Sequence, residues 1–285
     1  MNSKNREQED QLSKFRRYEF EKVKHFFNSN DKVLEIGGGS GFQASLISKC
    51  VDEIVSIDVY SHPIPVAEVK VYDGVNIPFP DKYFNVVFSS NALEHIQDID
   101  GIMLELKRVL KDNGVSVHIV PTVSWRIFTS LAHYPGIPRL LWSNYQNLKT
   151  KITLSAVSQA PTPEPRDETK PSSLGLINIQ WILNIFTHFK LKWIKSILLS
   201  PRHGERGNAL TEAWFYRSKW WQSVFKKNGM VIKDEFPLGL FYTGNMVLGR
   251  VLSLSSRRIL SKLFGSSTRI FFLKNKRRCS SVSDN

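Results

Sequence analysis

Glycines at positions 37, 39 and 41 are the residues of this sequence best suited to binding a ligand. They follow the apolar run 33–36, which has the length and residue types of a buried strand, and a helical pattern resumes at Phe42. Glycines let the backbone turn sharply and approach a ligand closely, and the start of the next helix suits a nucleotide or nucleoside. The nicotinamide fingerprint would require a third glycine at position 42, so the spacing argues against a dehydrogenase.

Two carboxylates follow the glycines at the ends of expected strands. Asp58 stands near the end of the expected strand 54–59, where a carboxylate accepts hydrogen bonds from both hydroxyls of a ribose. Asp73 and Gly74 follow the next expected strand, 69–72. Because ligands bind at the carboxyl ends of the strands in open α/β sheets, both carboxylates are expected at one crevice.

These motifs, together with the segment 77–95, resemble the class I S-adenosylmethionine-dependent methyltransferases. The segment reads Ile-Pro-Phe-Pro-Asp-Lys-Tyr-Phe-Asn-Val-Val-Phe-Ser-Ser-Asn-Ala-Leu-Glu-His. It is similar to the subgroup that contains the ubiquinone/menaquinone and small-molecule methyltransferases (type 11-like), with Asn85 where aspartate is usual. The resemblance implies S-adenosyl-L-methionine as the cofactor. The cofactor-binding residues that it implies are Glu35, Gly37, Gly39, Gly41, Asp58, Asp73, Gly74, Ser90 and Asn91.

The elements that must position these residues form a predicted α/β fold, a Rossmann-like doubly wound sheet of seven strands with a mainly helical insertion before the last two. A helix at 11–27 precedes the first strand, and a helix capped near residue 98 leads to a fifth strand at 115–120. A helix at 214–228 and strands at 230–233 and 238–242 then close the sheet. Two prolines within 60–66 shorten the crossover after the second strand, in a departure from the family pattern.

Four segments follow from these patterns. Residues 1–121 form the cofactor-binding core, and residues 122–213 form a helical insertion that serves as a substrate lid. Residues 214–249 form the closing helix and hairpin, and residues 250–285 form a basic C-terminal tail. Within the insertion, the apolar segment 174–199 is interpreted either as lid packing or as a helix lying on a membrane surface.

The acceptor side of the reaction is expected in the polar, glycine-containing segment 203–212, because such a loop can bind a substrate. A hydroxyl acceptor needs a base. The candidate bases are His203, Glu205, His133, His118 and Glu94, of which His203 and Glu205 are predicted as the catalytic residues. The resemblance favours a structural or cofactor-facing role for the pair Glu94–His95, and His118 lies inside an expected strand.

The formal net charge of +13 indicates an anionic partner. Residues 250–278 interleave basic and apolar side chains without an acidic residue, which is typical either of a helix on an anionic membrane or of a solvated tail. The fourth strand lacks the Asn/Asp-Pro-Pro-aromatic motif of nucleic-acid N-methyltransferases, which argues against amino-group methylation of a base but not against nucleic-acid binding in general. A nucleic-acid partner is not expected. Two distant cysteines and a polar N-terminus favour a cytoplasmic protein, and no metal-ligand spacing is present.

Two functions of different classes therefore remain open. The first is a methyltransferase that acts on a small-molecule, lipid-linked or sugar acceptor. The alternative is a methyltransferase-fold protein that binds without catalysis, which the short crossover and the unassigned base keep open. A nucleic-acid methyltransferase would depend on the charge alone. The sequence leaves the acceptor and the oligomeric state unassigned.

Overall fold

The computed structural model describes residues 3–136, 142, 146, 150, 200–244 and 251–275. The chain divides into two compact units, of which one comprises residues 1–129 and 202–285 and the other residues 130–201. All of the sheet and all of the candidate cofactor residues belong to the first unit, which is described below. The predicted apolar segment 174–199 lies outside the described residues.

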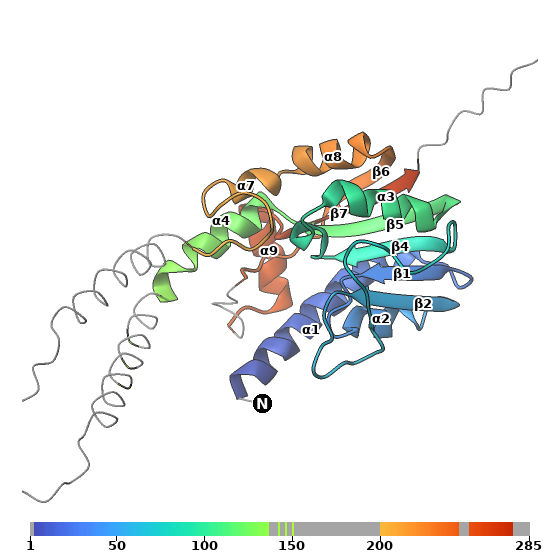
Figure 1. The fold of residues 1–285 in the computed structure, drawn as a ribbon. Coiled ribbons are helices and arrows are strands. Elements are labelled where there is room, and N and C mark those ends of the chain that lie inside the picture. Colours follow the sequence, from blue (N-terminus) through green and yellow to red (C-terminus); the bar gives the residue numbers. More distant parts are fainter. Residues whose placement is uncertain are drawn as a thin grey trace, which may run out of the picture. The chain divides into compact units, whose positions relative to one another are not determined.

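In the described part of the chain, seven strands form one sheet in the order β3-β2-β1-β4-β5-β7-β6 (Figure 1). The first five strands are parallel, and β7 is antiparallel to both of its neighbours. The strands are β1 (Lys32–Ile36), β2 (Glu53–Asp58), β3 (Lys70–Val71), β4 (Phe84–Ser90), β5 (Leu110–Pro121), β6 (Met230–Pro237) and β7 (Thr268–Asn275). The predicted fold class is confirmed. The strand order reverses between β1 and β4, which places a ligand crevice at their carboxyl ends.

Helices cover both faces of the sheet. The helical segments of the described residues are α1 (Ser3–Val23), η1 (Lys24–Phe26), α2 (Phe42–Ile47), η2 (Leu93–His95), α3 (Ile99–Val109), α4 (Val123–Leu131), η3 (Tyr134–Gly136), α7 (Glu212–Phe215), α8 (Ser218–Lys227) and α9 (Leu254–Phe264). Helix α3 begins at Asp98, whose side chain accepts a hydrogen bond from the Gly101 amide at 2.9 Å.

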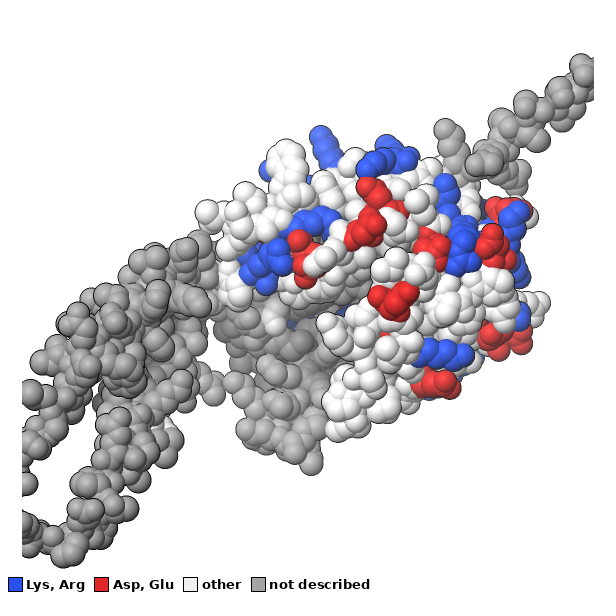
Figure 2. Space-filling model, viewed as in Figure 1, with Lys and Arg blue, Asp and Glu red and all other residues white. Residues whose placement is uncertain are grey.

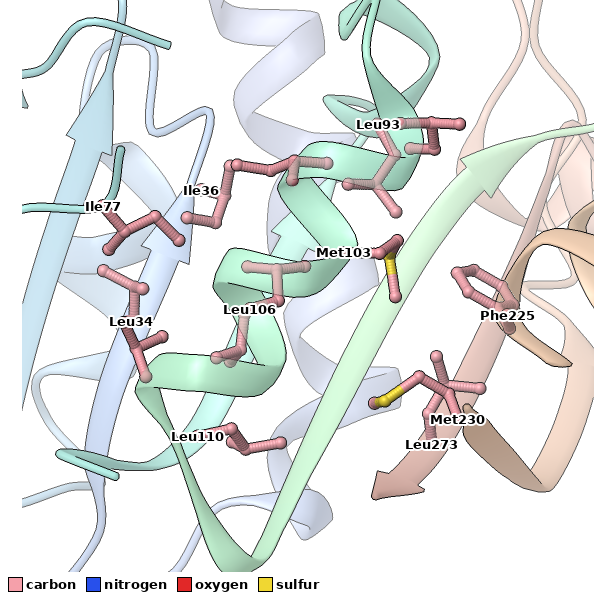
Figure 3. Close-up of a cluster of buried hydrophobic side chains, with 14 of the residues drawn as sticks. Leu34, Ile36, Ile77, Leu93, Met103, Leu106, Leu110, Phe225, Met230 and Leu273 are labelled. Carbon is pink, nitrogen blue, oxygen red and sulfur yellow. The ribbon is translucent and has the colours of Figure 1, made fainter. Parts of the chain in front are cut away.

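The hydrophobic core consists of two clusters, one on each face of the sheet. Successive residues of β1 point to opposite faces, so Val33 joins one cluster and Leu34 joins the other. In the cluster that contains Leu34, Met103 and Leu106 of α3 and Phe225 of α8 pack on the sheet (Figure 3). The core therefore fixes α3 and α8 on one face, whereas α1 and α2 pack on the other.

The location predicted for the seventh strand is wrong. Residues 238–242 form no strand, because Gly239 has a φ of +84° and the chain turns away after Pro237. The seventh strand is β7, which lies within the predicted basic tail and pairs with β5 and β6. Its apolar residues Ile270 and Phe271 are fully buried. Burial of this apolar run outweighs the flanking charges and draws the segment into the sheet.

Arg257 of the predicted tail is also buried rather than solvated. Its guanidinium group donates a hydrogen bond to the Phe241 carbonyl at 3.1 Å and lies 4.9 Å from the centre of the Phe15 ring. This contact fixes the inner side of α9 against α1. The predicted boundary at residue 250 therefore does not separate a tail from the core, since residues 202–285 belong to the unit that contains the sheet.

Among the described residues, none of the helices is both long and apolar enough to cross a membrane.

Candidate cofactor and acceptor site

The glycine-rich loop after β1 combines two closely packed glycines with one that is open. A Cβ atom on Gly37 would lie 2.4 Å from the Cβ of Ala92, and one on Gly41 would lie 2.6 Å from the Ala67 carbonyl oxygen. A Cβ atom on Gly39 would meet no heavy atom within 4 Å, although its φ of +54° also favours glycine. Gly37 and Gly41 are therefore needed for packing, whereas Gly39 presents open backbone to a ligand.

The short crossover after β2 packs directly on this loop. The Val66 amide donates a hydrogen bond to the Ser40 carbonyl at 2.7 Å, and Ala67 lies against Gly41. No helix occurs in residues 59–69, as the two prolines predict. The abbreviated crossover thus supports the loop from the side on which the family usually has a helix.

Asp58 is fixed at the carboxyl end of β2 by backbone amides. Its Oδ2 atom accepts a hydrogen bond from the Gly39 amide at 2.8 Å, and its Oδ1 atom accepts one from the Val59 amide at 2.7 Å. The carboxylate thus contacts the glycine loop directly. The two contacts orient the carboxylate at the loop, where a ribose would need it.

Glu35 lies beneath the glycine loop. Its side chain is buried and accepts a hydrogen bond from the Ser56 hydroxyl at 2.6 Å. A Cβ atom on Gly38 would lie 3.2 Å from the Glu35 carboxyl group. Removal from water raises the pKa of Glu35 to about 7, despite the opposing hydrogen bond from Ser56. This position supports the loop from within the sheet.

Asp73 and Gly74 occupy a tight turn after β3. The Asp73 carboxylate accepts hydrogen bonds from the amides of Val75 and Asn76 at 2.8 and 2.7 Å and from the Asn76 side chain at 2.8 Å. These three bonds, led by that from the Asn76 side chain, lower the pKa of Asp73. Asp73 is exposed, and its lowered pKa favours the ionised form.

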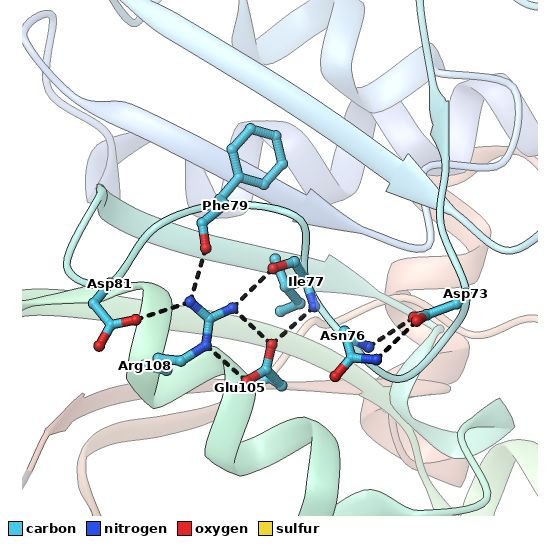
Figure 4. A network of polar contacts seen from close by, with 7 residues as sticks. All are labelled: Asp73, Asn76, Ile77, Phe79, Asp81, Glu105 and Arg108. Atoms are coloured by element: carbon cyan, nitrogen blue, oxygen red, sulfur yellow. Dashed lines mark hydrogen bonds and ion pairs between the residues drawn. The ribbon is translucent and has the colours of Figure 1, made fainter.

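The loop beyond this turn is tied to helix α3 by an ion pair that the sequence analysis missed (Figure 4). Arg108 donates hydrogen bonds to the carbonyls of Phe79 and Ile77 at 2.7 and 2.8 Å. Glu105 accepts from the Ile77 amide at 2.8 Å and pairs with Arg108 at 2.7 Å. The two residues thereby satisfy both backbone groups of Ile77 and fix the path of the loop that begins at Asp73.

Ser90 and Asn91 end β4 next to polar side chains from α1. The Ser90 hydroxyl accepts a hydrogen bond from Arg16 at 2.6 Å and donates one to Glu19 at 3.0 Å. Arg16 and Glu19 also pair with each other at 2.6 Å. Asn91 has a φ of +51°, an uncommon value for a residue other than glycine, and such residues concentrate at functional sites. Helix α1 therefore brings a charge pair, of which Glu19 is buried and Arg16 is partly exposed, to the predicted methionine end of the site.

On the acceptor side, the structure brings His203 together with Glu94 and His95. The ring centres of His203 and His95 lie 4.7 Å apart, and Trp125 packs on His203 at 4.5 Å. The Glu205 amide donates to the Glu94 carbonyl at 2.9 Å, so the two segments run side by side. Partial burial of the ring, followed by the nearby charges of His95 and Arg126, lowers the pKa of His203 to about 4. The ring is therefore neutral at pH 7.

Glu205 pairs with residues beside this cluster. Its carboxylate pairs with Arg202 at 3.2 Å and lies 3.5 Å from the amide nitrogen of Gln97. His118 is fully buried beside Ser89, and burial lowers its pKa to about 3, which confirms its inaccessibility. His133 belongs to the second unit. Of the two predicted catalytic residues, His203 is the one whose side chain meets Glu94 and His95, whereas the Glu205 carboxylate pairs with Arg202.

A buried ion pair holds the segment that carries His203. Arg126 of α4 and Glu212 of α7 are both buried and lie 2.6 Å apart. The second oxygen of Glu212 accepts a hydrogen bond from the His203 amide at 2.8 Å and one from the Gly204 amide at 2.5 Å. Sequence reasoning missed this arrangement because Arg126 is distant in the chain from Glu212 and His203. The available signal was a single acidic residue, Glu212, at the end of a polar loop.

The chain resembles known methyltransferases over its N-terminal half. A family described as "Methyltransferase domain" matches residues 5–157. An uncharacterized methyltransferase, YcgJ, from Bacillus subtilis is 30% identical over 95 residues, which are 29% of this chain and 38% of that protein. The ubiquinone/menaquinone biosynthesis C-methyltransferase UbiE from Neisseria meningitidis is 32% identical over 111 residues, which are 32% of this chain and 45% of that protein.

The matched part of this chain thus spans less than half of these relatives' length. Among solved structures, a "putative S-adenosylmethionine dependent methyltransferase" from Listeria monocytogenes aligns with a TM-score of 0.49 and 14% sequence identity. The alignment covers 92% of this chain and 98% of that one.

Proposed function

Since this chain belongs to the class I S-adenosylmethionine-dependent methyltransferases, we propose that it transfers a methyl group to a small-molecule acceptor, with lipid-linked molecules and sugars included in that class. The observation that carries the proposal is the contact between the open glycine, Gly39, and the Asp58 carboxylate at 2.8 Å. The family match supports S-adenosyl-L-methionine as the cofactor.

The residues at the crevice fit this cofactor. Asp58 would hold the ribose, and Gly39 leaves room for it because no side chain fills the space above the loop. Asp73, which carries a negative charge, would accept from the adenine amino group, while Ser90 and Asn91 would hold the methionine part. Gly37, Gly41, Gly74 and Glu35 are proposed to shape this site rather than to contact the ligand through side-chain atoms.

When bound, the cofactor supplies an electrophilic methyl group whose bond to sulfur breaks with its electron pair kept by the sulfur. The protein has to align the acceptor and accept its proton. We assign the proton to the cluster of His203, Glu94 and His95, because a neutral histidine at pH 7 can accept one. Glu205 is proposed to act through Arg202 as a charged boundary of the loop.

An apolar groove supports an acceptor with a hydrophobic part. The groove has a volume of about 600 Å³ and includes the exposed side chains of Ile127, Leu210 and Trp214. It lies along the segment that also carries His203 and Glu212. Apolar walls with few polar groups are typical of sites for small molecules. The relatives named above as quinone methyltransferases agree with an aromatic, partly apolar acceptor for this chain.

We also propose that an anionic membrane surface is a partner, as an apolar acceptor would require. Helix α9 exposes Ile259 and Leu263 next to the basic residues Arg258 and Lys262. A helix that exposes both kinds of side chain can lie at a lipid headgroup layer. Elsewhere, basic and acidic side chains are interspersed on the face shown in Figure 2, which does not support a nucleic-acid partner.

Calorimetric titration with S-adenosylmethionine and S-adenosylhomocysteine tests the cofactor site. Wild type should bind both ligands, and Asp58→Ala should abolish binding. The matched control is Asp112→Ala, which removes a carboxylate from an exposed ion pair with Lys82 and should leave binding unchanged. Binding by wild type without methyl transfer to quinol, lipid and sugar acceptors would favour the non-catalytic alternative. Equal binding by the Asp58 variant would refute the assigned site.

A further inference from the structure

Three potential metal ligands meet at the carboxyl end of β4. They are the carboxylate of Glu94 and the imidazoles of His95 and His203, and one ligand atom from each lies within 4.8 Å of the other two. The Nε2 atom of His95 is 4.0 Å from the Oε1 atom of Glu94. Two imidazoles and one carboxylate form a ligand set that binds zinc and related divalent transition metals in proteins.

Glu94 shows that this cluster lacks a component. The side chain is only 2% exposed, and neither carboxylate oxygen has a hydrogen-bond partner among the described residues. A buried carboxyl group without partners is costly, and a bound cation removes that cost by satisfying both oxygens. The two histidines, in contrast, retain access to solvent, so an ion can reach the cluster from outside.

The backbone around the cluster brings the ligands together. The Glu205 amide donates to the Glu94 carbonyl at 2.9 Å, which keeps the segment of His203 beside η2. Gly204 allows this approach, because a Cβ atom there would lie 2.9 Å from the same carbonyl oxygen. Glu212 fixes the His203 amide at 2.8 Å. Such outer contacts orient the groups that bind a metal.

We propose that Glu94, His95 and His203 bind one divalent transition-metal ion, with Zn²⁺ as the reference ion. Metal–ligand bonds of about 2.1 Å require ligand atoms about 3.4 Å apart in a tetrahedral site, so the cluster has to contract by about 1 Å. Rotation of the two partly exposed imidazoles supplies this movement. The three ligands leave a coordination position open, as in catalytic rather than structural zinc sites.

The ion would bind an acceptor hydroxyl oxygen at the open position. A metal-bound hydroxyl would lose its proton more readily, so the acceptor would reach its nucleophilic form at neutral pH and release the proton to water. With the ion bound, Glu94, His95 and His203 would be its ligands, so the ion would take the place of the histidine base proposed for the metal-free protein. This catalytic role rests on the proposed function, whereas metal binding itself does not. Acceptors with a hydroxyl group at or beside the methylated atom are the class that the site would favour.

The test uses the full chain, freed of metal by a chelator and with any affinity tag removed. Calorimetry with Zn²⁺ should show one saturable equivalent, and Co²⁺ should give visible absorption bands of a four- or five-coordinate site. Glu94→Gln, His95→Asn and His203→Asn should each raise the Zn²⁺ Kd by about tenfold or more. The matched control, His62→Asn, alters a half-buried histidine outside the cluster whose ring lies 2.9 Å from the Ile64 carbonyl oxygen, and it should leave the Kd unchanged.

Binding of S-adenosylhomocysteine by the same variants serves as the measure of folding. Absence of a saturable Zn²⁺ site in a wild type that binds S-adenosylhomocysteine would overturn the metal site and leave the proposed function standing. Unchanged Zn²⁺ affinity in all three variants would also overturn it. Absence of cofactor binding by a wild type that binds Zn²⁺ would instead refute the proposed function alone.

Discussion

Substitution of Gly39 by alanine separates ligand binding from folding at the glycine loop. A Cβ atom at this position would meet no protein atom within 4 Å, so the cost to the fold is the left-handed backbone alone. For an alanine at a φ of +54° that cost is about 1–2 kcal/mol. The same Cβ atom would project into the space in which the cofactor has to approach the backbone. We expect the Kd for S-adenosylhomocysteine to rise at least tenfold, which corresponds to about 1.4 kcal/mol or more.

Gly229→Ala is the matched control for this substitution. Gly229 has a φ of +71°, and an added Cβ atom would lie 2.9 Å from the flexible end of Lys107. An alanine there would therefore have similar backbone strain, but Gly229 lies just after α8 and is not one of the candidate cofactor residues. The Tm of both variants should be lower than that of the wild type by about 2–8 °C. Calorimetry should show weakened cofactor binding only for Gly39→Ala.

Gly37→Ala provides the opposite case, since its Cβ atom would lie 2.4 Å from that of Ala92. This variant should lose more stability than either of the other two. Equal cofactor affinity in wild type and Gly39→Ala would refute the reasoning, because an open glycine would then have no ligand above it.

Three further perturbations test other parts of the structure. Arg108→Ala removes the hydrogen bonds that hold the loop after Asp73 and should lower the free energy of unfolding by about 2 kcal/mol in urea titrations. Its control, Lys82→Ala, removes one side of an exposed ion pair and should change the free energy of unfolding by less than about 0.5 kcal/mol. Below pH 4.5, Glu35 is protonated in both the folded and the unfolded protein. As the pH rises toward 7, the folded protein retains this proton because the folded pKa is about 7, whereas the unfolded chain loses it. The stability of the wild type should therefore fall by about 3 kcal/mol relative to that of Glu35→Gln as the pH rises from 4.5 to 7. A difference between the two proteins that is independent of pH would contradict this assignment. Leu263→Glu should reduce co-sedimentation with anionic vesicles, while the equally exposed Leu104 of α3, replaced in the same way, should not alter it.

The parts of the fold that the sequence predicts are those in which local pattern and tertiary packing agree. Strands β1, β2, β4 and β5 and the helices between them carry apolar runs or helical spacing that the core then buries, as Leu34 and Met103 show, whereas the short β3 is exposed. The prediction of the seventh strand failed because Arg269 and Lys274 flank its four apolar residues, 270–273. These charges led to the interpretation of the segment as a basic tail. The turn residues 265–267 and the β-forming run were the available signals.

The candidate site divides in the same way. The predicted cofactor residues come from short segments at strand ends, so a topology of parallel strands brings them to one crevice. The acceptor-side cluster joins residues 94–95 to residue 203, and no local spacing reports that contact. Arg126 was missed for a related reason, because its partner Glu212 lies far away in the chain and the pair becomes evident only when both are buried. Arg16 and Glu19 stand three residues apart in one helix, but their contact with Ser90 is not reported by that spacing.

The non-catalytic alternative depended on the short crossover and on the absence of an assigned base. The crossover now offers less support for it, because Val66 and Ala67 pack on the glycine loop in place of a helix. The acceptor side of the site also offers less support for the non-catalytic alternative. A protein that only binds a ligand gains nothing from a buried carboxyl group without partners at Glu94, and an apolar residue there would stabilise the fold. Glu94 beside two histidines is instead the arrangement expected where a proton or a cation has to be bound during a reaction. The acceptor side, rather than the cofactor loop, therefore provides the structural argument for catalysis.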